Sequence, residues 1–250
     1  MPAFDLSLDA TARDELFDEL FNRYAKGSLG RLPSRVRALA KRWAWSGVVG
    51  GSRAVKRGAD IAGASMMLIV LSPVFGAVAL AIKLTDNGPV LFWQKRIGQY
   101  GEPFDFPKFR SMVANAEQLK AKLLAQNDHG DGITFKMKRD PRVTWIGRLI
   151  RKTSIDELPQ LINVLRGEMS LVGPRPPVPG EVARYTQKDR RRLEVKPGLT
   201  CIWQVSGRGD IPFPEQVELD VRYIESQSIR QDLTILLQTI PAVLLGKGAY

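Results

Sequence analysis

The hydrophobic and polar positions of this chain change their pattern twice along its 250 residues. Within residues 1–25, apolar side chains recur at helical spacing and predict an amphipathic helix. Residues 20–59 then hold ten Lys or Arg and no Asp or Glu, and Val36, Leu39 and Trp43 share one helical face there. Basic amphipathic helices of this kind bind anionic membrane surfaces, although a solvated basic linker or a nucleic-acid-binding arm has the same composition.

The next pattern is a run of 22 residues without a charged side chain, from Ile61 to Ile82. A straight helix of that length, at about 1.5 Å per residue, would cross a hydrocarbon core of roughly 30 Å. Ser72-Pro73 lies at the centre of the run, however, and basic residues flank both ends. We therefore favour a re-entrant helix, which enters and leaves by the same face, over a spanning helix. A buried helix of a soluble protein is a third alternative.

After Lys83 the pattern is that of a compact domain with short strands and amphipathic helices. Residues 90–94 predict a short strand, 103–112 an extended segment, and 158–165 a helix that ends at Gly167. Residues 196–208 predict a turn, a strand and a second turn, and residues from 215 to 245 are mainly helical. We expect an α+β fold that is mostly helical, with three parts: an N-terminal extension (1–54), a re-entrant membrane helix broken at Ser72-Pro73 (55–85) and a catalytic domain (86–250).

Two adjacent carboxylates, Asp156 and Glu157, lie at the start of the helix expected near residue 158. The spacing of Ser154 and Glu157 matches a capping box, in which both side chains would satisfy backbone amides of the helix start. Pro159 argues against this interpretation, because a helix capped by Ser154 would place proline beyond its first turn. The alternative is a functional pair of acids just outside the helix.

Basic residues surround this acid pair in the sequence and suggest a site for a phosphate-bearing substrate and a divalent metal. Seven Lys or Arg lie between residues 136 and 152. Lys108 and Arg110 fall on the same side of an extended segment, where they could bind a phosphate. Arg175 is carried by a loop that Gly173 and several prolines make rigid.

Composition narrows the chemistry further. The net charge of +11 indicates an anionic partner without choosing among nucleic acid, membrane and phosphorylated small molecules. With one cysteine, Cys201, and one histidine, His129, a disulfide framework, a zinc site and a Ser-His or Cys-His catalytic arrangement are ruled out or disfavoured. Carboxylates or lysine must then do any acid–base work.

Taken together, several motifs resemble those of the bacterial sugar transferase family, the monotopic polyprenyl-phosphate phosphoglycosyl transferases. Five of them occur in order between about Val55 and Tyr250: the Ser72-Pro73 break, Lys108-Phe109-Arg110-Ser111-Met112, Thr153 to Gln160, Gly173-Pro174-Arg175-Pro176, and Lys196 to Arg208. Residues 163–167 and 246–250 further resemble members that start exopolysaccharide or O-antigen repeats. Cys201 stands where many relatives have glycine.

The resemblance implies a transferase that moves a sugar 1-phosphate from a nucleotide diphosphosugar, by resemblance UDP-glucose or UDP-galactose, to polyprenyl (undecaprenyl) phosphate. It implies Mg²⁺, Asp156 as the nucleophile that forms a covalent aspartyl phosphosugar, and Glu157 as the metal ligand. The phosphate or nucleotide contacts that it implies are Lys108, Arg151, Arg175 and Arg208. The enzyme would sit on the cytoplasmic (inner) membrane in contact with lipid, with the active site facing the cytoplasm.

Two other functions remain open from the residues alone. In a membrane-bound basic scaffold or nucleic-acid-binding protein, the acid pair would only cap a helix. A membrane-anchored Mg²⁺-dependent phosphohydrolase would share the site but need no lipid acceptor. The resemblance favours the transferase, with no nucleic acid as partner and with a homodimer as an open possibility.

Overall fold

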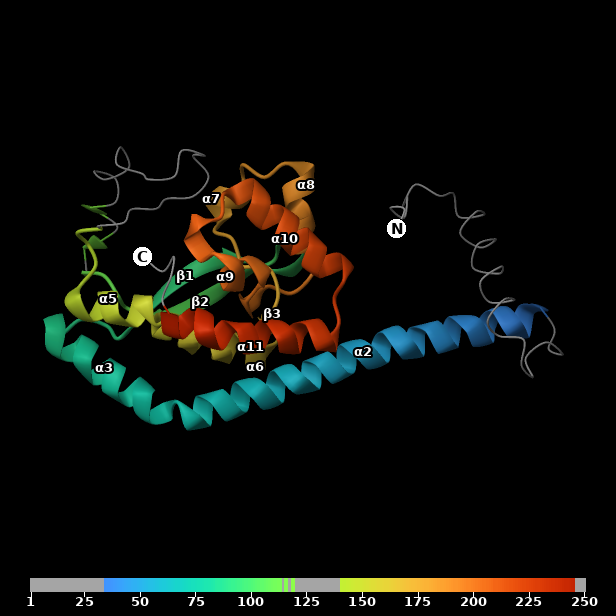
Figure 1. Ribbon diagram of the computed structural model, residues 1–250, viewed down its shortest axis with the longest axis horizontal. Helices are drawn as coiled ribbons and strands as arrows, with labels where there is room; N and C mark the ends of the chain where they lie inside the picture. The colour runs from blue at the N-terminus through green and yellow to red at the C-terminus, as the bar shows by residue number, and fades with distance from the viewer. Residues whose placement is uncertain (1–33, 114, 117, 120–139, 246–250) are drawn as a thin grey trace. The chain divides into compact units, whose positions relative to one another are not determined.

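The computed structural model describes residues 34–113, 115–116, 118–119 and 140–245 (Figure 1). The chain divides into two compact units, Met1–Val55 and Lys56–Tyr250. The amphipathic helix expected within residues 1–25 lies outside the described residues. The candidate site lies in the second unit.

The long apolar run forms two helices with a sharp bend between them. One residue, Leu71, separates helix α2 (Ser34–Val70) from α3 (Ser72–Asp86). The chain bends by 59° between the segments Arg53–Val70 and Ser72–Thr85. Pro73 lies in the first turn of α3, where its missing N–H costs least, and the Ser72 hydroxyl donates to the Ile69 carbonyl at 2.8 Å. The break predicted at Ser72-Pro73 is therefore confirmed. In the described part of the chain no single helix is long and apolar enough to cross a membrane. The two helices of the bent pair, taken together, do have the necessary length and apolar composition.

An antiparallel hairpin follows the bent pair. Strands β1 (Leu91–Ile97) and β2 (Pro103–Phe109) are joined by the short 3-10 helix η2 (Gln99–Gly101). Strand β1 is longer than the strand expected over residues 90–94. Alternation along β2 buries Phe104 and Phe106 on the face of the strand that also carries Lys108, while Phe109 is buried in a separate cluster with α3 and α5.

The acid pair lies in a turn between two short helices. Helix α5 (Trp145–Lys152) begins at Thr144, whose hydroxyl accepts a hydrogen bond from the Gly147 amide. After it come the 3-10 helix η4 (Ile155–Gln160) and α6 (Leu161–Arg166). Helix α6 buries Leu161 and Val164 and ends at Gly167, whose φ of 84° is the left-handed conformation predicted for this cap.

A parallel pair of short strands carries the loop with Arg175. Strand β3 (Ser170–Val172) pairs with β4 (Gly198–Thr200). At the start of β4 the backbones approach so closely that a Cβ at Gly198 would lie 2.0 Å from the nitrogen of Gly173, the residue after β3. Only glycine fits there, which fixes the start of the Arg175 loop. The chain between the two strands forms α7 (Pro179–Val182), α8 (Gln187–Arg190) and η5 (Arg191–Leu193).

The segment after β4 is helical rather than extended. The strand expected within residues 196–208 ends at Thr200, and α9 (Ile202–Ser206) and η6 (Arg208–Asp210) follow it. Helices α10 (Phe213–Glu225) and α11 (Ile229–Leu245) are the last described elements, and both lie where helices were expected. The fold is thus mostly helical with a few short strands, which confirms the general fold class.

One turn of α2 is joined to the rest of the second unit by polar contacts, which we call the α2 latch (Lys56, Arg57 and Asp60). The Lys56 ammonium contacts Asp232 of α11 at 2.5 Å. The Arg57 guanidinium donates to the carbonyls of Val164 and Leu165, at 2.5 and 2.8 Å, at the end of α6. The Asp60 carboxylate accepts from the Ser170 hydroxyl and the Leu171 amide of β3.

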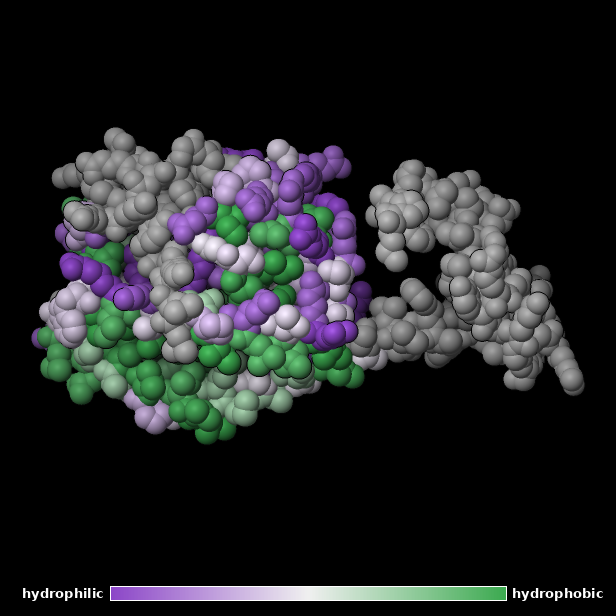
Figure 2. Space-filling view, in the orientation of Figure 1, coloured by the Kyte–Doolittle hydropathy of each residue, from purple (hydrophilic) through white to green (hydrophobic). Residues whose placement is uncertain are grey.

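Apolar side chains are exposed along the bent helix pair. Figure 2 shows hydrophobic residues gathered over α3 and the part of α2 next to it. The exposed large side chains of these two segments include Met66, Ile69, Val70, Leu80 and Leu84. An exposed apolar area of this kind marks a surface that contacts lipid or another protein.

Candidate active site

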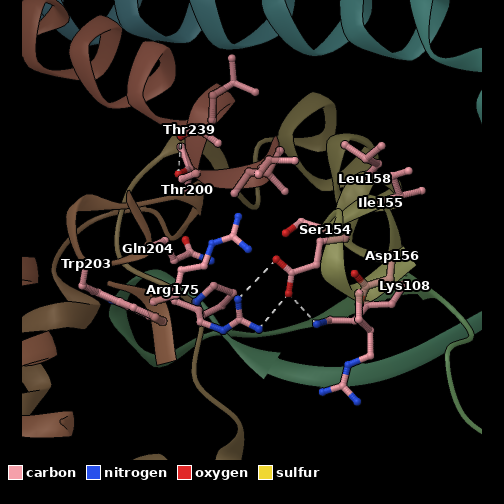
Figure 3. A pocket seen from close by; sticks show the side chains of 18 of the residues that line it. Lys108, Ser154, Ile155, Asp156, Leu158, Arg175, Thr200, Trp203, Gln204 and Thr239 are labelled. Atoms are coloured by element: carbon pink, nitrogen blue, oxygen red, sulfur yellow. Dashed lines mark hydrogen bonds and ion pairs between the residues drawn. The ribbon is translucent and has the colours of Figure 1, made fainter. Parts of the chain in front are cut away.

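The turn that carries the acids is not built as a capping box. Ser154 adopts a φ of 53°, unusual for a residue with a side chain, and its hydroxyl makes no capping hydrogen bond. The left-handed residue redirects the chain between α5 and η4, and Asp156 and Glu157 line a cavity. Figure 3 shows this cavity from close by, with Ser154 and Asp156 labelled. The capping-box interpretation is therefore wrong, and the acids precede the α-helix, which begins at Leu161.

Glu157 is held by two cations from distant parts of the sequence. Its Oε1 atom lies 2.8 Å from Nζ of Lys108 on β2 and 2.9 Å from Nη2 of Arg175. Nη1 of Arg175 also donates to Oε2, at 3.4 Å. Burial favours the neutral acid, but the charges of Arg175 and Lys108 and their hydrogen bonds outweigh it and hold the pKa of Glu157 well below its usual range. Glu157 is therefore a carboxylate at neutral pH.

Asp156 lies beside this cluster in a different environment. It is 7% exposed, and no described residue donates a hydrogen bond to its carboxylate. Burial raises the pKa of Asp156 to about 6, and the negative charge of Glu157 adds to this rise, while Lys108 opposes it. At neutral pH Asp156 is thus a largely ionised carboxylate whose oxygens remain available.

The cavity around the acids has a volume of about 740 Å³. All six residues singled out in the sequence line it: Lys108, Arg151, Asp156, Glu157, Arg175 and Arg208. Arg110 does not, because its guanidinium lies against Gly88 instead. Of the two bases that share one side of the extended segment, only Lys108 therefore reaches the acids.

The same cavity also has an apolar region. This region comes from the C-terminal end of α2, from the bend that follows it, and from α11, which packs beside α2 (Figure 1). The residues that they contribute include Met67, Leu71, Leu236, Ile240 and Val243. The Thr200 and Thr239 hydroxyls lie 2.8 Å apart and link β4 to α11 at the wall of the cavity (Figure 3). One cavity thus combines charged groups suited to phosphate with a surface suited to hydrocarbon.

The acid pair is also the candidate ligand set for a divalent cation. Within the described ranges no group of three or more His, Cys, Asp or Glu side chains converges. Mg²⁺ commonly takes one or two carboxylates together with phosphate oxygens of a substrate. Of the two acids, Glu157 is the one kept ionised by its neighbours, and it fits a Mg²⁺ ion whose remaining ligands come from a bound phosphate and water.

Sequence reasoning missed two arginines of the cavity wall. Arg96 lies on β1, two residues beyond the expected end of that strand, and a longer alternating pattern would have included it. Arg192 is in a stretch that looks like a solvated charged face, yet its side chain is 5% exposed and its Nε lies 2.7 Å from Oδ2 of buried Asp220. Nothing in the local sequence marks that ion pair.

Comparison with known proteins gives the family. A family model described as bacterial sugar transferase matches residues 51–246. The chain belongs to this family. The resemblance drawn from the motifs is thus confirmed, and Asp156, Glu157 and the four basic residues of the cavity all lie within the matched range.

Three relatives illustrate the similarity. Galactosyl transferase CpsE of Streptococcus agalactiae is 50% identical over 196 residues, which are 78% of this chain and 43% of the relative. Undecaprenyl-phosphate galactose phosphotransferase of Salmonella typhimurium is 45% identical over 203 residues, 80% of this chain and 42% of the relative. Exopolysaccharide production protein ExoY of Sinorhizobium fredii is 41% identical over 198 residues, 78% of this chain and 88% of the relative. The chain thus spans less than half the length of the first two and most of the third.

Proposed function

We propose that this protein transfers a sugar 1-phosphate from a UDP-hexose to a polyprenyl phosphate such as undecaprenyl phosphate, and so starts polysaccharide assembly. The observation that carries the proposal is the single cavity in which two carboxylates and several cations adjoin apolar side chains of α2 and α11. The cationic region suits a diphosphate, and a lipid phosphate has both a charged and an apolar part. The names of the relatives, which include a galactosyl transferase and an undecaprenyl-phosphate galactose phosphotransferase, agree with this chemistry.

Asp156 is the nucleophile in the proposed mechanism. A carboxylate oxygen of Asp156 attacks the phosphorus that bears the sugar, the bond from this phosphorus to the nucleotide breaks, and the nucleoside monophosphate leaves. The product is an aspartyl phosphosugar. An oxygen of the lipid phosphate then attacks the same phosphorus and displaces Asp156. Neither step requires a proton, because the leaving nucleotide and the attacking lipid phosphate are both anions, so the described cavity residues need no histidine among them.

The cations of the cavity neutralise the phosphate oxygens during both steps. Lys108 and Arg175 are already oriented by Glu157, so little reorganisation is needed when a phosphate binds beside them. Arg151 and Arg208 lie on the same cavity and are proposed to bind the rest of the diphosphate. A guanidinium suits this role because its fixed fork matches two phosphate oxygens at once.

We further propose Mg²⁺ as the cofactor, with Glu157 as its protein ligand. The bound cation would supply charge neutralisation at the diphosphate. Glu157 is ionised and faces the cavity, and its own contacts to Lys108 and Arg175 can be exchanged when a phosphate takes over these two cations.

The bent helix pair is proposed to be a re-entrant membrane element that holds the enzyme on the cytoplasmic membrane. In this arrangement residues 55–85 enter the lipid, residues 86–250 form the catalytic domain on the cytoplasmic side, and residues 1–54 are an extension. The 59° bend and the exposed apolar side chains of α2 and α3 support it.

The decisive experiment is intact-mass analysis of the enzyme mixed with a UDP-hexose and Mg²⁺ but no lipid acceptor. We expect an added sugar phosphate on the native protein and none on Asp156→Asn, because an amide is a far poorer nucleophile. Asp105→Asn is the matched control, since Asp105 carries the same group on an exposed part of β2 with 54% of its side chain accessible. Glu157→Gln should weaken the dependence on Mg²⁺ as well as the rate.

Several outcomes would contradict the proposal. Normal turnover by Asp156→Asn, or an adduct that maps to another residue, would remove Asp156 as nucleophile. Release of free sugar phosphate without need of lipid phosphate would indicate a phosphohydrolase. No nucleotide release from any diphosphosugar would favour a scaffold or a nucleic-acid-binding protein.

A further inference from the structure

Arg96 is a cation on the cavity wall whose charge no ion pair in the described structure neutralises. Its Nη1 donates to the Pro176 carbonyl at 2.9 Å, and its Nε donates to Oε1 of Gln94 at 3.1 Å. The guanidinium carbon also lies 5.1 Å from the centre of the Phe106 ring. All three partners are neutral. They fix the direction of the guanidinium without compensating its charge.

This environment disfavours a cation. Burial lowers the pKa of Arg96 to about 10, and the nearby positive charge of Arg175 lowers it further, while Glu181 and Glu157 act in the opposite direction. Burying a charge without a paired partner normally destabilises a protein. A cation that is held in such a place by oriented neutral groups therefore points to an anion that binds there.

The charges around the cavity point the same way. Three carboxylates line it, those of Asp156, Glu157 and Glu181. Six cations line it: Arg96, Lys108, Arg151, Arg175, Arg192 and Arg208. Arg192 is paired to Asp220 outside the cavity wall, and the other cations of the wall still outnumber its carboxylates, which favours an anionic ligand.

We propose that Arg96 binds a phosphate group of a substrate directly, beside Arg175. The Arg96 guanidinium donates to the carbonyl of Pro176, the residue next to Arg175. This hydrogen bond joins β1 to the Arg175 loop and holds Arg96 close to Arg175. Nη2 of Arg96 donates to none of the described residues and is available to a phosphate oxygen. This inference rests on the proposed function, and two substrates of that reaction carry suitable groups, the diphosphate of the sugar nucleotide and the phosphate of the lipid.

The test compares Arg96→Gln, Arg96→Lys and the control Lys95→Gln. Lys95 is the adjacent residue of β1, and its ion pair with Asp105 is mostly exposed, with 63% of the Lys95 side chain accessible. For Arg96→Gln we expect the KM of one substrate to rise about tenfold or more, the loss typical of a charge-assisted hydrogen bond. Arg96→Lys should be intermediate, because the charge remains and the fork is lost. Lys95→Gln should keep the native KM for both substrates.

Thermal unfolding distinguishes binding from a structural role. Because the substitution removes a partly buried cation that has no ion-pair partner among the described residues, the melting temperature of Arg96→Gln should be unchanged or higher while the KM rises. A rise confined to the sugar nucleotide assigns Arg96 to the diphosphate, and one confined to the lipid assigns it to the lipid phosphate. Native KM values for both substrates, or a raised KM that Arg96→Lys does not partly restore and that accompanies a lower melting temperature, would overturn the inference.

The same assay separates this inference from the proposed function. If the native protein neither releases nucleotide from a UDP-hexose nor binds UDP in calorimetry, the proposed function fails. If the native protein does both and Arg96→Gln matches it, only the assignment of Arg96 fails.

Discussion

Asp156 and Glu157 are neighbours in the chain, yet their carboxyl groups are in opposite situations. Glu157 is surrounded by cations that keep it ionised and occupy its oxygens. Asp156 is buried without a hydrogen-bond donor among the described residues, so its pKa rises and its lone pairs remain available. A nucleophile needs available lone pairs, whereas a group that orders cations or a metal needs a stable charge. The assignment of roles thus follows from the environments and not from the order of the two residues.

Arg175 and Arg208 should respond differently to replacement. Arg175→Ala leaves Glu157 with Lys108 alone, so we expect the free energy of unfolding to fall by about 1–3 kcal/mol and the KM for the sugar nucleotide to rise. Arg208→Ala should raise the KM with less than about 0.5 kcal/mol of destabilisation, because no described acidic group is within ion-pair distance of it. Steady-state kinetics and thermal unfolding measure the two effects. Equal destabilisation by both changes would contradict this distinction.

Helix α2 has a second role besides its apolar surface. Through the α2 latch it contacts α6, which follows the acid turn, and β3, which leads to Arg175. Both sides of the Glu157–Arg175 ion pair are therefore attached to one turn of α2. The position of this helix and the geometry of the site are coupled by direct contacts.

Arg57 is the member of the α2 latch that is best suited to a test. Its guanidinium satisfies two carbonyls at the C-terminus of α6, where a positive charge is also favoured by the helix dipole. We expect Arg57→Gln to lower the free energy of unfolding by about 1–3 kcal/mol. Arg53→Gln, on an exposed part of the same helix, should change it by less than about 0.5 kcal/mol. Thermal unfolding of both variants checks this, and equal stabilities would show that the contact contributes nothing.

The elements that could be predicted from sequence are those that local chemistry determines. Proline disfavours a helix interior but fits a first turn, as Pro73 does in α3, and Gly167 accepts a left-handed conformation without strain, so the bend and the end of α6 were both predicted. Residues 201–205 are a short, largely apolar run, whose pattern does not distinguish a strand from a buried helix, and α9 was missed.

The parts of the site that sequence did not predict depend on tertiary contacts. The spacing of Ser154 and Glu157 matches a cap, but Glu157 turns instead to Lys108 and Arg175, which lie 49 and 18 residues away. The fold must first bring Lys108 and Arg175 next to Glu157 before its carboxylate can bind them instead of a backbone amide. The six candidate residues were nevertheless found around one cavity, because the family motifs that contain them are short and specific. Their individual roles stay predictions.

For the whole molecule, the re-entrant proposal places both ends of the bent helix pair on the cytoplasmic side. Cysteines introduced at Val55 and Pro89, both exposed, should not react with a membrane-impermeant maleimide added outside intact cells. Permeabilising the same cells should make both positions react, which controls for accessibility. Strong labelling of either position from outside would show that the pair crosses the membrane.

The native thiol has a practical consequence for spectroscopy. Cys201 is fully buried, burial raises its pKa well above the usual range, and its Sγ donates to Oε1 of Gln204. Such a thiol is hardly ever a thiolate and is poorly accessible, so it reacts slowly with alkylating reagents. Pairs of spin labels or fluorophores can then be attached at chosen surface cysteines of the otherwise native chain. Distances across the bend between α2 and α3 become measurable in lipid without first removing a side chain that packs behind the cavity wall.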